Sequence, residues 1–119
     1  MSSEQTENVL MHHLQAFGEG DVEAIMEDYT DESVVITPDG PLNGSDEIRP
    51  LFEHFFDNVL PPDSTSFDMQ QQVIHGEVAY ILWSAASDSH DVPLGTDTFV
   101  IRDGKILVQT FAGQIDAKI

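Results

Sequence analysis

The stretch GEGDVEAIMEDYTDESVVITPDGPLNGSDEI, from Gly18 to Ile48, decides the fold class of this chain. Asp21 is a typical N-cap, and the residues after it predict a short helix that runs to about Tyr29. Residues 33–37 are rich in β-branched side chains and predict a strand. The Pro38-Asp39-Gly40 turn closes that strand. The stretch therefore predicts a helix and a strand in close succession, followed by the start of another helix.

The segment before this stretch predicts a helix over residues 3–17, with Ser2 and Gln5 as a capping box. Its apolar residues recur at helical spacing and form one stripe, made of Val9, Leu10, Leu14 and Phe17. His13 lies within this stripe, whereas His12 is expected to point to the opposite side. The pattern therefore places one imidazole on the buried face of the helix.

A third helix is expected after Gly44-Ser45, and Pro61-Pro62 ends it. Pro50 removes a backbone donor, so a kinked or separate first turn is predicted. The residues expected to face inward share the helical spacing and are Ile48, Leu51, Phe52, Phe55, Phe56 and Leu60.

The second half of the chain predicts four strands, over residues 69–75, 78–87, 94–102 and 105–114. Asp103-Gly104 between the last two favours a type I′ hairpin turn. Helices followed by consecutive hairpins indicate an α+β fold, with three N-terminal helices packed on one face of a curved antiparallel sheet. A cavity between the two layers is a usual place for a ligand.

The composition limits the partners of the chain. Its 119 residues predict a single domain over residues 1–119. Twenty-two acids and four bases give a formal charge of −18, which repels phosphate backbones and anionic lipids, so neither nucleic acid nor membrane is an expected partner. The same charge is typical of a halophilic, salt-loaded cytoplasm. The N-terminal residues show no signal-peptide or membrane-span pattern, so a cytoplasmic location is expected.

The Gly18–Ile48 stretch and the closing segment DTFVIRDGKILVQTFAGQID, Asp97 to Asp116, together resemble the nuclear transport factor 2-like superfamily. This superfamily includes ketosteroid isomerase and the SnoaL-like polyketide cyclases. The resemblance covers nearly the whole chain in the order of its elements. It implies a cone-shaped fold with a deep pocket, commonly assembled as a homodimer through the sheet face.

The resemblance to ketosteroid isomerase also implies a partial active site. His13 takes the position of a helix-one tyrosine, and Asp97 falls on an aspartate of a late strand. Tyr29 matches a tyrosine that supports the oxyanion hole. Thr37 stands where the proton-shuttling aspartate belongs, and a threonine hydroxyl is too weak a base for that task. The resemblance thus implies a pocket without its usual catalytic aspartate.

His13 and Asp97 are the catalytic candidates, with His13 as proton carrier and Asp97 as its orienting partner. The alternatives are a core histidine satisfied by a neighbour and an aspartate on the solvent face. Tyr29 fits a structural hydrogen bond better than catalysis, and Trp83 and Phe111 fit either the pocket or a dimer face. The expected ligand-binding residues are Tyr29, Thr37, Phe52, Phe56, Trp83, Phe99, Gln109 and Phe111.

These patterns predict a small-molecule pocket protein, similar to an acid–base isomerase, cyclase or dehydratase acting on an apolar carbonyl or hydroxyl compound. The alternative is a non-catalytic dimeric module that binds a ligand or a protein. No metal site is expected, because the histidines lack ligand spacing and the chain has no cysteine. No cofactor is expected either, since no phosphate-binding loop is present.

Overall fold

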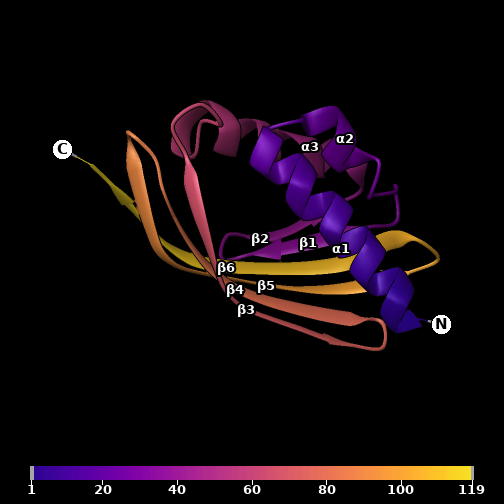
Figure 1. The fold of residues 1–119 in the computed structure, drawn as a ribbon. Helices are drawn as coiled ribbons and strands as arrows, with labels where there is room; N and C mark the ends of the chain where they lie inside the picture. The colour runs from indigo at the N-terminus through magenta and orange to yellow at the C-terminus, as the bar shows by residue number, and fades with distance from the viewer. Residues whose placement is uncertain (1, 119) are drawn as a thin grey trace.

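The computed structural model describes residues 2–118, and the side chains of residues 3–118. The fold has two layers, in which three helices cover one face of a curved six-stranded sheet (Figure 1). The helices are α1 (Ser2–Glu19), α2 (Val22–Met26) and α3 (Ser45–His54), and a π-helical segment η1 (Phe55–Val59) continues α3. Within residues 2–118, no helix combines the length and the apolar character needed to cross a membrane. The predicted α+β architecture is confirmed.

The sheet is mixed, whereas the sequence predicts an antiparallel one. Its strands lie in the order β2-β1-β6-β5-β4-β3. Neighbours are antiparallel except β1 and β6, which pair in parallel, because the early β1–β2 hairpin adds to the free edge of the last strand. The strands are β1 (Val34–Thr37), β2 (Gly40–Asn43), β3 (Ser66–His75), β4 (Val78–Ala86), β5 (His90–Arg102) and β6 (Lys105–Ala117).

The hairpin of β5 and β6 is longer than the sequence predicts. Residues 90–93 belong to β5 although a loop is expected there, and a register shift between Asp91 and Leu94 accommodates Pro93. The turn between the strands has positive φ values at Asp103 (55°) and Gly104 (78°). This agrees with the predicted type I′ turn, which needs positive φ at both central residues.

Two helices differ from the prediction. Helix α2 ends at Met26 instead of near Tyr29, because the Asp28 carbonyl accepts the backbone N–H of Ile106 at 2.7 Å and this ties the segment to the sheet. Helix α3 continues through Pro50, and the irregular turns come later, in η1. Helix α1 begins at Ser2, whose predicted capping side chain lies outside the described residues.

The core lies between the helices and the concave face of the sheet. Along β4 and β5, buried and partly exposed residues alternate, so each strand turns every second side chain toward the helices. Phe99 in the middle of β5 is fully buried. Other large side chains with full burial are Leu10, Ile25, Ile48, Ile101 and Ile106.

We expect Phe99→Ala to lower the free energy of unfolding by about 3–5 kcal/mol, because the change removes a buried ring and leaves a cavity. The measurement is urea unfolding at fixed, high salt. Met11 on α1 is half exposed, and Met11→Ala should change the unfolding free energy by no more than about 0.5 kcal/mol. Equal losses for the two variants would contradict this placement of the core.

Candidate active site

A cavity of about 330 Å³ lies between the helical layer and the concave face of the sheet. Its wall is largely apolar, and the polar side chains on it are His13, Asp68, Asp97 and Gln109. Much of the wall is aromatic and consists of Phe17, Phe52, Phe55, Trp83, Phe99 and Phe111. The volume and the mainly apolar lining are those of a small-molecule site.

Asp97 occupies the middle of this wall and is held by the two strands beside it. Phe111 on β6 and Ile81 on β4 lie directly opposite Asp97, so Gln109 and Trp83 are its diagonal neighbours. The Trp83 Nε1–H donates to Asp97 Oδ1 at 2.8 Å, and Gln109 Nε2 donates to Oδ2 at 2.8 Å. Each carboxylate oxygen therefore accepts one hydrogen bond from the protein.

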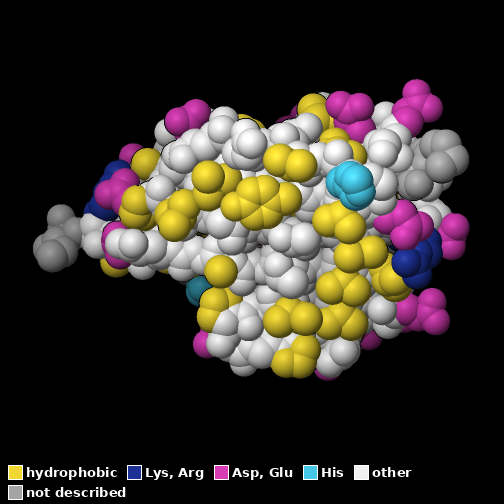
Figure 2. Space-filling view, turned by 90° about the horizontal axis from the view of Figure 1, so that it is seen from below, with side chains coloured by type: hydrophobic (Ala, Val, Ile, Leu, Met, Phe, Trp, Pro, Cys, Tyr) yellow, Lys and Arg dark blue, Asp and Glu magenta, His cyan; other side chains and the backbone are white. Residues whose placement is uncertain are grey.

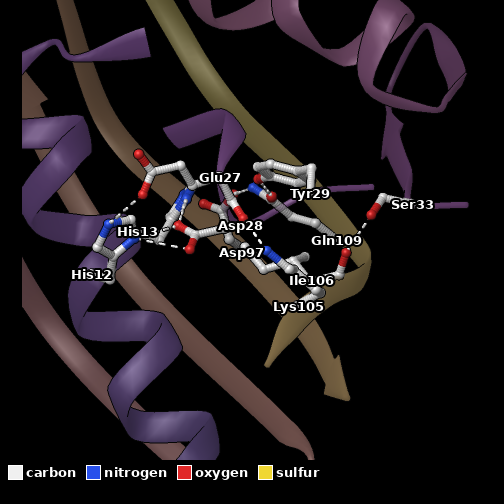
Figure 3. Close-up of polar contacts among 10 residues, drawn as sticks. All are labelled: His12, His13, Glu27, Asp28, Tyr29, Ser33, Asp97, Lys105, Ile106 and Gln109. Carbon is white, nitrogen blue, oxygen red and sulfur yellow. Dashed lines mark hydrogen bonds and ion pairs between the residues drawn. The ribbon is translucent and has the colours of Figure 1, made fainter. Parts of the chain in front are cut away.

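Tyr29 fixes the orientation of Gln109 from the opposite layer. It follows α2, is buried, and its hydroxyl donates to Gln109 Oε1. With its oxygen engaged in this way, Gln109 can turn only its amide nitrogen toward Asp97 (Figure 3). Tyr29 thus supports the carboxylate through Gln109, in line with the structural role that the sequence favours for it.

Among the side chains of residues 3–118, the Asp97 carboxyl has no positive partner. Burial raises its pKa to about 6, although the hydrogen bonds from Trp83 and Gln109 act in the opposite direction. No lysine or arginine is found among the described residues that line the cavity. At pH 7 this aspartate is mainly ionised, and a modest drop in pH protonates it.

His13 lies in the same wall and is 3% exposed. Its ring is surrounded by aromatic side chains, with centroid distances of 5.4 Å to Phe99 and 5.8 Å to Phe52. Burial, with a smaller effect from the neighbouring His12, lowers its pKa to about 4. The imidazole is therefore neutral at physiological pH.

The direct His13–Asp97 pair suggested by the sequence does not form. Within residues 3–118 no hydrogen bond joins the two side chains, and the Asp97 oxygens instead accept bonds from Trp83 and Gln109. Both residues nevertheless line one cavity. The charged group near His13 is instead Asp28, whose Oδ2 lies 3.9 Å from His13 Nδ1.

Asp28 is bound by His12, which the sequence analysis placed on the opposite side of the helix. His12 Nδ1 lies 2.9 Å from both Asp28 oxygens, and its Nε2 lies 3.7 Å from Glu27. The hydrogen bond to Asp28 raises the pKa of His12. Consecutive helical residues are only about 100° apart, so His12 and His13 can flank one carboxylate.

The predicted ligand-binding residues divide into two groups. Phe52, Trp83, Phe99, Gln109 and Phe111 lie in the cavity wall. The other three, Tyr29, Thr37 and Phe56, are not part of it.

Thr37 is engaged in the turn between β1 and β2, away from the cavity. Its hydroxyl donates to the Gly40 carbonyl at 3.1 Å and accepts the backbone N–H of Asp39 at 3.1 Å. Phe56 is buried in the core and packs on Phe17, with 5.0 Å between ring centroids. Neither position supports the predicted ligand contact.

Sequence reasoning missed the contribution of β3 and of Asp28. Phe67 and Met69 line the cavity although each is 42% exposed, because β3 is an edge strand. Met69 begins the predicted strand 69–75 and Phe67 lies two residues before it, so an earlier start of this strand and its alternating pattern are the signal that could have found them. Among the residues that the structure describes, no cluster of three or more histidine or acidic side chains is arranged to hold a metal ion.

Gly95 on β5 makes room for the Trp83 indole, which lies against it across the strand pair. A Cβ atom at position 95 would stand only 2.5 Å from Cε2 of that ring. The residue of β6 that pairs with Gly95 is Gly113. The two glycines lie beneath the stacked rings of Trp83 and Phe111, whose centroids are 6.3 Å apart.

Gly95→Ala should displace the indole and weaken its hydrogen bond to Asp97, which raises the pKa of Asp97 further above its ordinary value. Crowding should also cost about 1–3 kcal/mol of stability. Carbon-13 NMR titration of the Asp97 carboxyl measures the pKa. Gly18 also lines the cavity, but it has open space around it, so Gly18→Ala should leave this pKa unchanged. An unaltered titration in Gly95→Ala would contradict the role given to Gly95.

A family model described as the SnoaL-like domain matches residues 10–109. No curated protein matches the chain. Solved structures share its fold at low sequence identity. An NTF2-like protein of unknown function from Mesorhizobium loti is 24% identical with a TM-score of 0.79, over 96% of this chain and 94% of that one.

Two other structures with this fold carry enzyme names. A ketosteroid isomerase candidate from Kribbella flavida is 10% identical, with a TM-score of 0.78 over 95% of this chain and 80% of its own. An LEH-like epoxide hydrolase from M. tuberculosis is 11% identical, with a TM-score of 0.75 over 96% of this chain and 86% of its own. At these identities the likeness concerns the fold alone.

Proposed function

Since the chain belongs to the SnoaL-like domain family, we propose that its cavity binds a mostly apolar small molecule, on which Asp97 performs acid–base catalysis while His13 holds the ligand in place. The ligand carries a carbonyl or a hydroxyl group. The reaction class is an isomerisation, a cyclisation or an elimination, each of which needs a proton to be moved in a dry site.

The observation that carries this proposal is the buried Asp97 carboxylate in an apolar wall, without a cation beside it. A group whose pKa is about 6 is ionised at neutral pH and still holds a proton well once it has taken one. The burial of an unpaired charge is costly, so a functional role accounts for its presence better than stability does.

The pKa values favour the reverse of the sequence prediction, in which His13 carries the proton and Asp97 orients it. Asp97 is the proton carrier, because its pKa lies near neutrality, whereas the pKa of His13 is about 4. Asp97 takes a proton from a carbon or hydroxyl of the ligand and returns it at another position. The neutral His13 forms a hydrogen bond to the polar end of the ligand and holds it in place.

The test uses 2-tetralone, an apolar ketone with acidic protons next to its carbonyl. In D₂O the protein should accelerate exchange of these protons, followed by NMR. The rate should rise with pH around a midpoint near 6, since the ionised form of Asp97 is the base. Asp97→Asn should slow the exchange by about 10²-fold or more.

Asp63→Asn is the matched control, because Asp63 is an exposed acid outside the cavity wall. This variant should keep the wild-type exchange rate and the same pH profile. Full activity in Asp97→Asn, or a rate without a midpoint near pH 6, would contradict the assignment of Asp97 as the base.

The second candidate function is a non-catalytic dimeric module. It predicts a cavity filled by side chains or free of titratable groups. The open volume of about 330 Å³ and the presence of Asp97 and His13 on its wall favour the enzyme. The acidic surface fits a salt-rich cytoplasm as the working environment under either function.

We also propose that two copies of the chain form a homodimer through the outer face of the sheet. Acidic side chains lie around the margin of this face, and its middle is free of them (Figure 2). Uncharged residues face one another across the strands in two rows, Val34, Val108, Val100 and Val78, and then Ile36, Thr110, Thr98, Tyr80 and Val73. Two copies of so acidic a chain repel one another elsewhere, so this face is the favourable contact.

Val108→Asp should dissociate the dimer, because it places two like charges in the uncharged contact. Light scattering after size-exclusion chromatography should give twice the 13.2 kDa chain mass for the wild type and one chain mass for the variant. Met11→Asp changes an exposed residue of α1 and should remain dimeric. A monomeric wild type, in the same high-salt buffer, would rule out the proposed contact.

A further inference from the structure

We propose that the ligand places a hydroxyl group beside Asp97 and His13, where its O–H donates to one of these two acceptors, because both side chains line the cavity and have lone pairs to offer. This rests on the proposed function and narrows its carbonyl-or-hydroxyl class to hydroxyl compounds, that is alcohols, phenols or enols. The donors around Asp97 and the carboxylate beside His13 both favour a hydroxyl ligand.

The groups around Asp97 keep it an acceptor. Trp83 has a single N–H, which points at Oδ1, and Gln109 directs an N–H at Oδ2. Tyr29 donates to the oxygen of Gln109, so that oxygen cannot turn to receive a proton from Asp97. A carboxylic acid would need an acceptor here, whereas a carboxylate needs donors. The lone pairs that remain on Asp97 are available to a donor of the ligand.

The neighbour of His13 selects one tautomer of its ring. His13 Nδ1 is buried without a hydrogen-bond partner in the described part of the chain, and Asp28 Oδ2 lies 3.9 Å from it. A neutral imidazole has one N–H and one lone pair, and the N–H is favoured on the side of a negative charge. The proton therefore resides on Nδ1. Nε2, the ring nitrogen away from Asp28, keeps its lone pair for the ligand.

The electrostatics of Asp28 come from the groups packed around it. His12 binds both of its oxygens, Glu27 lies on the outer side of His12, and the Lys105 ammonium donates to the Glu27 carbonyl (Figure 3). Burial raises the pKa of Asp28, whereas the hydrogen bond from His12 lowers it. The contact with His12 therefore holds the Asp28 carboxyl group on the Nδ1 side of His13.

Few donors are left on the wall of the cavity for a carbonyl-only ligand. The lining contains no lysine, arginine, serine or threonine among the described residues, and Gln109 retains one N–H beyond the bond to Asp97. Asp68 adds a further acceptor. A hydroxyl satisfies one of these unpaired acceptors, whereas a ketone satisfies none of them in a dry site, which weakens its binding.

The test compares three ligands of nearly the same shape: 1-indanol, 1-indanone and 1-aminoindane. Binding to the full chain is followed by two-dimensional amide NMR titration at pH 7. We expect 1-indanol to bind about tenfold more tightly than 1-indanone, since the ketone lacks the donor.

The outcomes separate this inference from the proposed function. If 1-indanone binds as well as 1-indanol, the hydroxyl preference is wrong and the apolar site remains. If 1-aminoindane binds most tightly, the site prefers a cation and the inference is also wrong. If none of the three binds, both the inference and the proposed function fail.

The tautomer of His13 gives an independent measurement. Long-range nitrogen-15 NMR of the imidazole in the wild type should show the proton on Nδ1. Asp28→Asn should shift the population toward the Nε2–H form and reduce the preference for 1-indanol. Glu27→Gln alters a carboxylate that lies beside His12 Nε2 on the outer side of the helix, so it should retain both properties. An Nε2–H tautomer in the wild type would overturn the inference, even if Asp28→Asn failed to fold.

Discussion

The hydrogen bonds that hold the Asp97 carboxylate are the interaction on which the site depends. A negative charge in a wall of aromatic rings is stable only if donors replace the water it has lost. Trp83 and Gln109 supply them from the two strands beside β5, and Tyr29 fixes Gln109 from the helical layer. Three strands and the segment after α2 must therefore be in register before the site exists.

The close packing around this carboxylate also explains a local feature of the sheet. The Trp83 indole reaches Asp97 only because it lies flat against Gly95, where any side chain would occupy the same space. Gly95 shows no left-handed φ, so the need for glycine here is a need for room. Two paired glycines weaken a sheet locally, and the stack of Trp83 on Phe111 covers the weakened place.

The sequence predicted the α+β class and the order of the main elements because local patterns determine them, but not the parallel pairing of β1 with β6, which joins distant segments. Helical spacing around His13, the Asp103-Gly104 turn and the alternation around Asp97 each act over a few residues. The partners of Asp97 could not be predicted in this way. Which side chains lie diagonally across β4 and β6 depends on register, and irregularities near Trp83 and Asp91 shift that register.

The position of Asp28 is even harder to predict from local sequence patterns. It follows a short helix in an acidic chain, and its sequence context is that of a solvated residue. Its position is fixed by the bond between its carbonyl and the N–H of Ile106, a contact between distant parts of the chain. The resemblance to known enzymes directed attention to Thr37, whose hydroxyl is used by its own turn. A tertiary contact, which no local pattern encodes, decided the position of Asp28, whereas the local β1–β2 turn decided that of the Thr37 hydroxyl.

The overall charge of the chain acts on the site through salt. At low ionic strength the many surface acids add a negative potential that favours a proton on Asp97. At about 1 M salt the screening length falls to about 3 Å, so these exposed charges no longer reach a buried group from a distance. The protonation of Asp97 is then governed by its burial and by the donors Trp83 and Gln109, which salt does not screen. An acidic surface and an ionised buried carboxylate are therefore compatible in a salt-rich environment, because salt screens the surface charges from the buried group.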